Sequence, residues 1–171
     1  MILGFSTKWP KKMGTLAGEP TYFPESICKG FTMDNEMAEW WKGTPPKMHT
    51  GYPDWAGIHN SMPIKPHTIR TDAGKRWKVG MDIHFYIDVR KISMMRFAPV
   101  KKVTAIQELE IQWIDQDKCK LERPLVFIDG AWITDVTELA LNDGFPTVEA
   151  FFTWFNTDFK GRIIHWTELR Y

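Results

Sequence analysis

The sequence I-K-P-H-T-I-R-T-D-A-G-K-R-W-K-V-G, residues 64–80, decides how the rest of the chain is interpreted. It brings Lys65, Thr68 and Arg70 within six residues of one another, and a basic turn follows them. Pro66 favours extended backbone at the residue before it. The stretch therefore predicts a short strand that carries an amine, an alcohol and a guanidinium into one small region of the fold.

The spacing of these side chains predicts which of them share a face. Side chains alternate between the two faces of a strand, so Thr68 and Arg70 should point together and His67 should point away. Lys65 has the wrong parity to join Thr68 on a straight strand. A bend at the proline would let its long side chain bring the ammonium beside the hydroxyl. A lysine held beside a hydroxyl in a partly dry site is one way to activate a weak nucleophile.

Composition places the chain among soluble globular proteins. It has 171 residues, of which 43% are hydrophobic and 25% charged, enough for one domain with a core. The two cysteines, Cys28 and Cys119, predict no disulfide framework, which suits a reducing compartment. We see no signal peptide and no apolar run long enough to span a membrane. The expected location is the cytoplasm of a cell or of a phage-infected cell; the sequence leaves the oligomeric state open.

Positive charge gathers in the middle of the chain. Residues 65–102 hold ten Lys or Arg against three Asp, although the whole chain carries a net charge of only +1. A basic middle on an acidic body suits a local site for phosphate or nucleic acid. A solvated basic face explains the same pattern, and the sequence leaves both interpretations open.

Hydrophobic periodicity predicts an α+β chain with strands in the middle and helices near both ends. Residues 81–89 alternate as a half-buried strand does, and Asp129-Gly130 marks a hairpin. Strands are expected at 1–5, 81–89, within 100–114, at 125–128, 131–133 and 163–166, and helices at 21–30, 34–42, 135–142 and from Thr147 onward. This order predicts a small, mixed, partly closed β-barrel with flanking helices.

Residues 31–63 stand apart from this pattern as an insertion. After the helix expected at 34–42, the segment is rich in Pro, Gly and His and contains Tyr52 and Trp55. A connection of this length without regular structure is usually functional or disordered. Its aromatic residues favour an ordered flap that covers the site at Lys65.

With these residues in view, the chain resembles the ASCH domain family, small proteins of PUA-like fold. The resemblance rests on a helix ending in Gly30, on K-P-H-T-I-R, on R-W-K-V-G before a strand, and on the later stretch L-N-D-G-F-P-T-V-E-A-F-F-T-W-F. It implies a single PUA-like domain over residues 1–171, interrupted by the insertion, as in uncharacterised phage and bacterial members. In the family's usual pattern the helix runs directly into K-x-x-T-I-R, so the insertion is a departure.

The resemblance implies two functions. Many members are presumed to bind RNA, and one bacterial branch hydrolyses the N4-acyl group of acetylated cytidine with a threonine, a lysine and a glutamate. Carried over, the threonine is Thr68, the lysine is Lys65, and the acid falls on Asp143, which is one methylene shorter than glutamate. Arg70 matches the family's arginine. Because the acid differs, binding of RNA or of a modified nucleotide is favoured over hydrolysis.

In the binding interpretation, the ring of Trp77 stacks on a base and His67 lies at the ligand site. The phosphate contacts would come from the basic turn: Lys75, Arg76 and Lys78. Trp77 could equally cover the end of the barrel, and the flap could instead bind another protein. The five histidines show no metal-ligand spacing, so no metal and no cofactor are expected.

Overall fold

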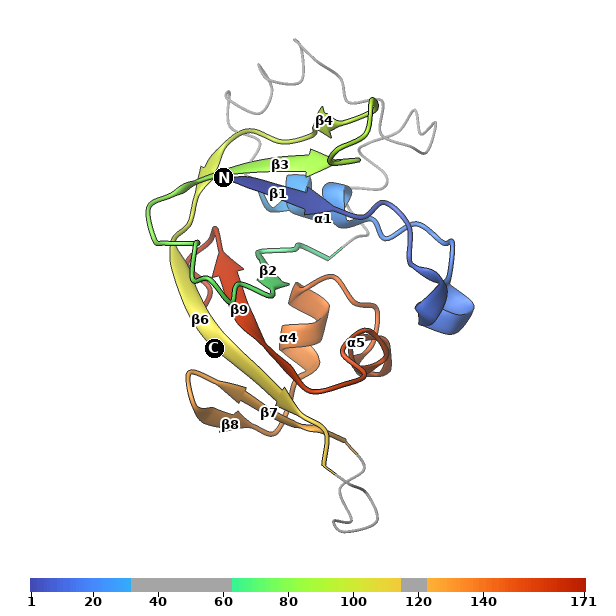
Figure 1. Ribbon diagram of the computed structural model, residues 1–171, viewed down its shortest axis with the longest axis vertical. Helices are drawn as coiled ribbons and strands as arrows, with labels where there is room; N and C mark the ends of the chain where they lie inside the picture. Colours follow the sequence, from blue (N-terminus) through green and yellow to red (C-terminus); the bar gives the residue numbers. More distant parts are fainter. Residues whose placement is uncertain (32–62, 115–122) are drawn as a thin grey trace. The chain divides into compact units, whose positions relative to one another are not determined.

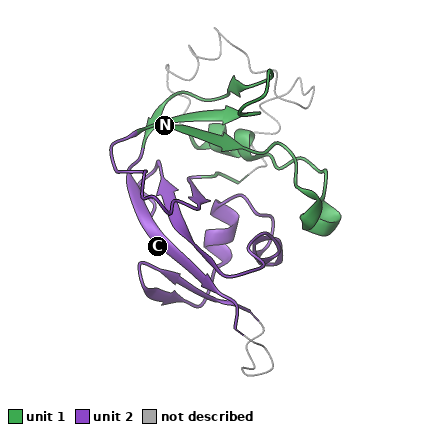
Figure 2. Cartoon of the chain, viewed as in Figure 1, with its two compact units in different colours: residues 1–65, 82–102 green, residues 66–81, 103–171 purple. Residues whose placement is uncertain are grey.

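The computed structural model describes residues 1–31, 63–114 and 123–171. The expected helix at 34–42 and nearly all of the flap lie outside the described residues. The chain divides into two compact units, shown in Figure 2, and each has its own sheet. Unit 1 comprises residues 1–65 and 82–102, and unit 2 comprises residues 66–81 and 103–171. The fold class is α+β, with mostly antiparallel strands and short helices.

Unit 1 is built on a strand whose alternate residues are apolar. In β3, Ile83, Phe85 and Ile87 are buried, as the alternation of residues 81–89 predicts. The N-terminal strand β1 pairs with β3 in parallel, and β4 and β5 pair with it antiparallel. The elements are β1 (Ile2–Phe5), the 3₁₀ helix η1 (Lys11–Leu16), α1 (Phe23–Gly30), β3 (Asp82–Ile87), β4 (Met95–Arg96) and β5 (Lys101–Lys102).

Unit 2 holds a five-stranded antiparallel sheet in the order β2-β9-β6-β7-β8. Figure 1 shows the two short helices α4 and α5 against this sheet. The elements are β2 (His67–Arg70), β6 (Ala105–Gln112), β7 (Leu125–Ile128), β8 (Ala131–Ile133), α4 (Thr137–Asn142), α5 (Val148–Trp154) and β9 (Phe159–His165). Strand β9 therefore lies between β2 and β6 and pairs with both of them.

Local sequence signals explain where these elements begin and end. The hairpin between β7 and β8 turns at Asp129 and Gly130, both with positive φ, as a two-residue hairpin turn requires. The Thr147 hydroxyl accepts a hydrogen bond from the N–H of Ala150 (3.1 Å) and caps α5. Before α4, Asp135 accepts a hydrogen bond from the N–H of Thr137 (2.9 Å), the residue at which the helix begins.

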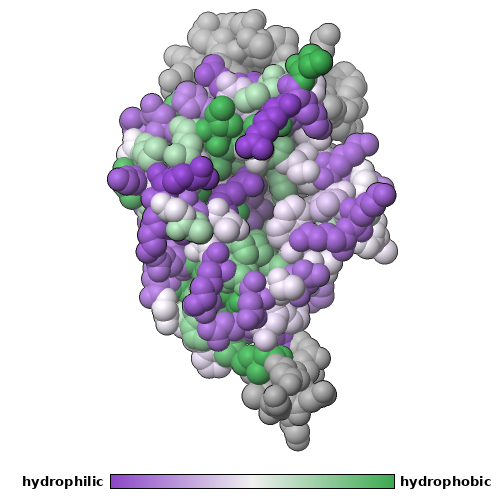
Figure 3. Space-filling model, viewed as in Figure 1, coloured by the Kyte–Doolittle hydropathy of each residue, from purple (hydrophilic) through white to green (hydrophobic). Residues whose placement is uncertain are grey.

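Aromatic side chains of the last helix form part of the core of unit 2. Phe151 of α5 is fully buried, and its ring lies 5.4 Å from that of Phe145 and 4.8 Å from that of Phe155. On the surface drawn in Figure 3, hydrophilic residues dominate and hydrophobic residues form small groups between them. In the described parts of the chain, we find no helix long and apolar enough to span a bilayer.

Candidate functional site

The carboxylate of Asp143 lies against strand β2, although the two are far apart in sequence. Asp143 follows the last residue of α4, and Gly144 (φ 87°) turns the chain away from the helix. Its Oδ1 accepts a hydrogen bond from the N–H of Ile69, at 3.2 Å. The residues around this contact, His67, Thr68, Arg70 and Asp143, are called the β2–α4 cluster below.

His67 faces the carboxylate rather than pointing away from the cluster. Its Nδ1 lies 3.8 Å from Oδ1 of Asp143, and its side chain is fully buried. The alternation of side chains along a strand places His67 on the face of β2 away from Thr68 and Arg70. Asp143, at the end of α4, contacts β2 and lies near His67, and this contact could not be predicted from the alternation.

A hydrogen-bond chain reaches the ring of His67. Asn142 Nδ2 donates to the phenolic oxygen of Tyr171 (3.0 Å), and this oxygen lies 2.7 Å from His67 Nε2. Burial raises the pKa of the Tyr171 phenol above its ordinary value, although the hydrogen bond from Asn142 opposes the shift. The phenol therefore keeps its proton, and the tautomer of His67 determines whether the phenol or Nε2 is the donor in this hydrogen bond.

Tyr171 is held by its backbone as well. Gln107 of β6 accepts from the Tyr171 N–H (3.0 Å) and donates to its backbone oxygen (2.8 Å). The side-chain nitrogen Nε2 of Gln107 also donates to Asp129 (3.0 Å). Nothing in the sequence pattern separates Tyr171 from an ordinary surface tyrosine, so sequence reasoning missed its contact with His67.

Tyr171→Phe is expected to lower the free energy of unfolding by about 1–2 kcal/mol, because it leaves the buried Nε2 of His67 and the amide of Asn142 without their partner. Urea denaturation measures the loss, and the ¹⁵N shift of His67 Nε2 should change when its hydrogen bond to the phenol is removed. Tyr86→Phe, at a half-buried tyrosine of unit 1, is the matched control. An unchanged Nε2 shift in Tyr171→Phe would contradict the hydrogen-bond chain.

Arg70 and Thr68 complete the cluster within unit 2. Burial lowers the pKa of the Arg70 guanidinium, and the Asp143 carboxylate partly offsets the shift. Arginine nonetheless stays charged in proteins, so the cluster contains a cation next to a carboxylate. Thr68 is buried on β2, which pairs with β9 through Ile164. The cluster thus combines a guanidinium, a carboxylate and a hydroxyl.

Lys65 lies in unit 1. Only 1% of Lys65 is exposed, its Nζ lies 4.8 Å from the centre of the Phe23 ring, and its N–H donates to the Ser26 carbonyl (3.1 Å). A lysine buried to this degree needs compensating contacts, of which the aromatic ring is one. The boundary between the units falls after Lys65, so its contact with Thr68 stays a prediction.

The basic turn after β2 is organised by a buried carboxylate. Asp72 accepts the N–H groups of Arg76 (3.0 Å) and Trp77 (3.1 Å) and the guanidinium of Arg162 (3.2 Å). Burial opposes its ionisation, but these donors outweigh it and hold the pKa of Asp72 below its ordinary value. The turn is thus a fixed structure rather than a loose basic loop.

The side chains of this turn take two different positions. Trp77 is 5% exposed, so its ring is buried and does not offer an open face for a base. The cations instead face solvent: Lys75, Arg76 and Lys78. Lys75 pairs with Glu108 of β6 at 2.9 Å.

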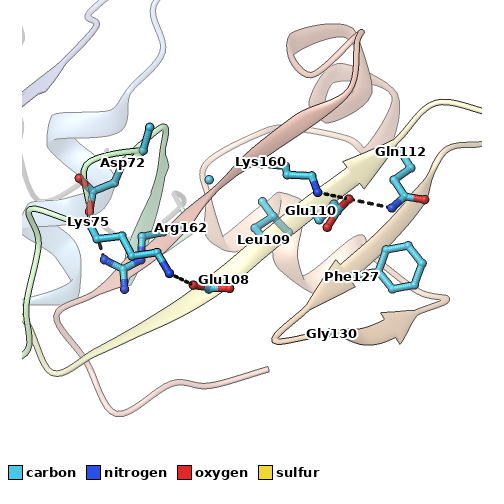
Figure 4. Close-up of a pocket in the computed structure, with 12 residues that line it drawn as sticks. Asp72, Lys75, Glu108, Leu109, Glu110, Gln112, Phe127, Gly130, Lys160 and Arg162 are labelled. Atoms are coloured by element: carbon cyan, nitrogen blue, oxygen red, sulfur yellow. Dashed lines mark hydrogen bonds and ion pairs between the residues drawn. The ribbon is translucent and has the colours of Figure 1, made fainter.

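A groove of about 510 Å³ lies on unit 2 outside the β2–α4 cluster (Figure 4). The basic turn lines one part of it and strands β6, β7 and β9 line the rest; of the predicted site residues, only Lys75 contributes. Sequence reasoning missed Glu110 and Phe127, which also line it. The hairpin at Asp129-Gly130 could have revealed Phe127, because a two-residue turn pairs it with Trp132.

His165 is a buried histidine that the sequence did not single out. It is fully buried at the end of β9, and neither ring nitrogen has a hydrogen-bond partner among the described residues. Its ring lies 5.2 Å from that of His67 and 6.1 Å from that of Tyr171. Burial lowers the pKa of His165 to about 4, with Arg170 adding to the shift and Asp129 opposing it.

In the described ranges, no three side chains of His, Cys, Asp or Glu converge as metal ligands do. The chain matches no family model, no curated protein and no solved structure.

Proposed function

We propose that this protein is an ASCH-type domain of PUA-like barrel fold that binds RNA or a modified nucleotide at Lys65, Thr68 and Arg70. The observation that carries the proposal is the hydrogen bond from Ile69 to Asp143, which brings a carboxylate to the strand that carries Thr68 and Arg70. Such a set presents donors and acceptors at fixed positions, as recognition of a base edge or phosphate requires.

Polar groups this deeply buried are costly to keep in a purely structural role. In unit 2, His67, Thr68 and Asp143 are buried together beside a cation. Clusters of buried titratable and polar side chains are common at functional sites, which supports a ligand site here over a plain structural role.

Fluorescence anisotropy with a short single-stranded RNA tests the binding proposal. We expect binding that weakens as salt concentration rises, and a loss of affinity of roughly three- to tenfold in Thr68→Val and about tenfold in Arg70→Lys, which keeps the charge but loses the planar fork. Thr68→Ser should retain affinity because it keeps the hydroxyl. Thr153→Val, at an exposed threonine that bonds only its own helix, is the control. Equal affinity in Thr68→Val and wild type would contradict the proposal.

A second candidate is hydrolysis of the N4-acyl group of acetylated cytidine. It is favoured by the burial of both Lys65 and Thr68, because a partly dry amine can serve as the base for a hydroxyl nucleophile. Thr68 Oγ1 would attack the amide carbonyl while the neutral Lys65 amine takes its proton. Breakage of the C–N bond releases cytidine, which takes up a proton, and water then frees acetate from the threonine.

Chromatography after incubation with N4-acetylcytidine decides between the two. Release of cytidine and acetate that is lost in Thr68→Val and in Lys65→Met, with both variants folded, would establish the hydrolase. Salt-sensitive RNA binding without any release would support the binding domain. If neither occurs, a protein partner becomes the better explanation.

A further inference from the structure

The groove on unit 2 has an aromatic end. The register of the sheet places Lys160, Glu110, Phe127 and Trp132 opposite one another on four neighbouring strands, so their side chains form one row on one face. Trp132 is 59% exposed, and Phe127 beside it lines the groove. Bases of single-stranded nucleic acids stack on such exposed rings, because each base presents a flat face.

The other end of the groove carries Lys75, from the turn after β2. Figure 4 shows Lys75 reaching from the turn toward Glu108, with which it forms an ion pair in which both side chains are largely exposed. An exposed pair adds little stability, so Lys75 can exchange the carboxylate for a phosphate at small cost. Lys78 in the same turn is exposed and has no ion-pair partner among the residues described here. The buried Asp72 fixes the position of this turn.

A carboxylate lies between the two ends. Glu110 accepts hydrogen bonds from Gln112 Nε2 (2.7 Å) and forms an ion pair with Lys160 Nζ (2.9 Å), as Figure 4 shows. A glutamate carboxylate accepts a hydrogen bond from the exocyclic amino group of cytosine, a group that uracil lacks. Glu110 is two residues from Glu108 on β6, a separation of about 7 Å along a strand. Lys75, which pairs with Glu108, and Phe127, which lies opposite Glu110, are therefore offset by about this separation along the sheet.

We propose that this groove binds an unpaired nucleotide whose base carries an amino group. The base stacks on Phe127 and Trp132, its amino group meets Glu110, and its phosphate meets Lys75 and Lys78. The groove is a separate site from the β2–α4 cluster, and only the class of ligand rests on the proposed function. The size of the groove is within the range of small-molecule sites, roughly 300–1,000 Å³.

NMR titration of the whole protein with cytidine 5′-monophosphate tests the proposal. We expect this probe to shift the indole N–H signal of Trp132 and the amide of Phe127, and to bind about tenfold more weakly to Phe127→Ala. Uridine 5′-monophosphate should bind more weakly than the cytidine compound, and Glu110→Gln should reduce that preference. Cytidine, which lacks the phosphate, should bind equally well to wild type and to Lys75→Ala.

Two variants that change the charge near Lys75 should alter the affinity for the monophosphate in opposite directions. Lys75→Ala should weaken binding of the monophosphate severalfold, whereas Glu108→Gln should strengthen it, because it frees Lys75 and removes a like charge from the phosphate. Lys91→Ala is the matched control: Lys91 is an equally exposed lysine, paired with Asp88 in unit 1, and its loss should change nothing.

The proposal is overturned if millimolar monophosphate leaves the signals of Phe127 and Trp132 in place. It is also overturned if Phe127→Ala and Lys75→Ala both bind as wild type does. NMR signal shifts confined to Thr68 and Arg70 would exclude binding at the groove but would agree with the proposed function. Shifts at the groove that persist unchanged in Thr68→Val would support the groove, whether or not the cluster binds RNA.

Discussion

Asp72→Ala is expected to lower the free energy of unfolding by about 3–5 kcal/mol, as removal of one partner of a buried ion pair does. The change leaves the Arg162 guanidinium, which is only 18% exposed, without its carboxylate. It also removes the acceptor for the N–H groups of Arg76 and Trp77. The turn that carries Lys75 should loosen together with the loss of stability.

Urea denaturation followed by circular dichroism measures this loss. Asp158→Ala is the control, because Asp158 also accepts a backbone N–H, that of Trp113 (2.7 Å), but does so on the exposed surface. Asp72→Asn keeps the size of the side chain and should lie between wild type and alanine. A loss no larger in Asp72→Ala than in Asp158→Ala would show that the buried pair does not organise the turn.

The second large effect is a pH dependence of stability caused by His165. The pKa of this histidine is about 4 in the folded protein and about 6.5 in the unfolded chain. Between these pKa values the unfolded chain binds more protons than the folded protein. The contribution of His165 to the free energy of unfolding is therefore fully present above pH 6.5 and decreases as the pH falls toward 4. The shift corresponds to about 3 kcal/mol at most. Urea midpoints measured across this range should follow that decrease.

Several charged or titratable groups lie near His165 and influence its protonation. His67 and Tyr171 contact its ring, Arg170 acts against its protonation and Asp129 favours it. His165→Phe keeps a ring of similar shape and should flatten the pH dependence. His84→Phe, at a half-buried histidine on β3, should leave the slope as it is. If His165→Phe shows the wild-type slope, another group causes the decrease.

Sequence alone predicted the elements whose signals are local. The alternation in β3 and the two residues of the hairpin turn at Asp129-Gly130 each specify backbone shape without help from distant residues. The start of β9 was missed: the strand begins at Phe159, well before the expected Ile163. Residues 159–162 are less apolar than those that follow, and it is pairing with β6 that extends the strand.

The residues of the candidate site came from two sources, and their function stays a prediction. The short motif singled out Thr68 and Arg70, the family resemblance implied Asp143, and the structure places the Asp143 carboxylate against β2. The part played by Tyr171 depends on a hydrogen bond that spans 104 residues, which no local pattern encodes. Burial of Trp77 likewise follows from packing in unit 2, because a tryptophan within a basic stretch looks the same whether it is exposed or covered.

The place of β9 between β2 and β6 affects how this protein is made on the ribosome. β2 and β6 both emerge during translation well before β9, the strand to which each of them bonds. Until then the backbone groups of β2 that face β9 have no strand to pair with, and strand edges left open in a nascent chain invite pairing with other chains. Completion of this sheet therefore has to wait for residues 159–165, and slow elongation just before them would prolong the interval in which chaperones are needed.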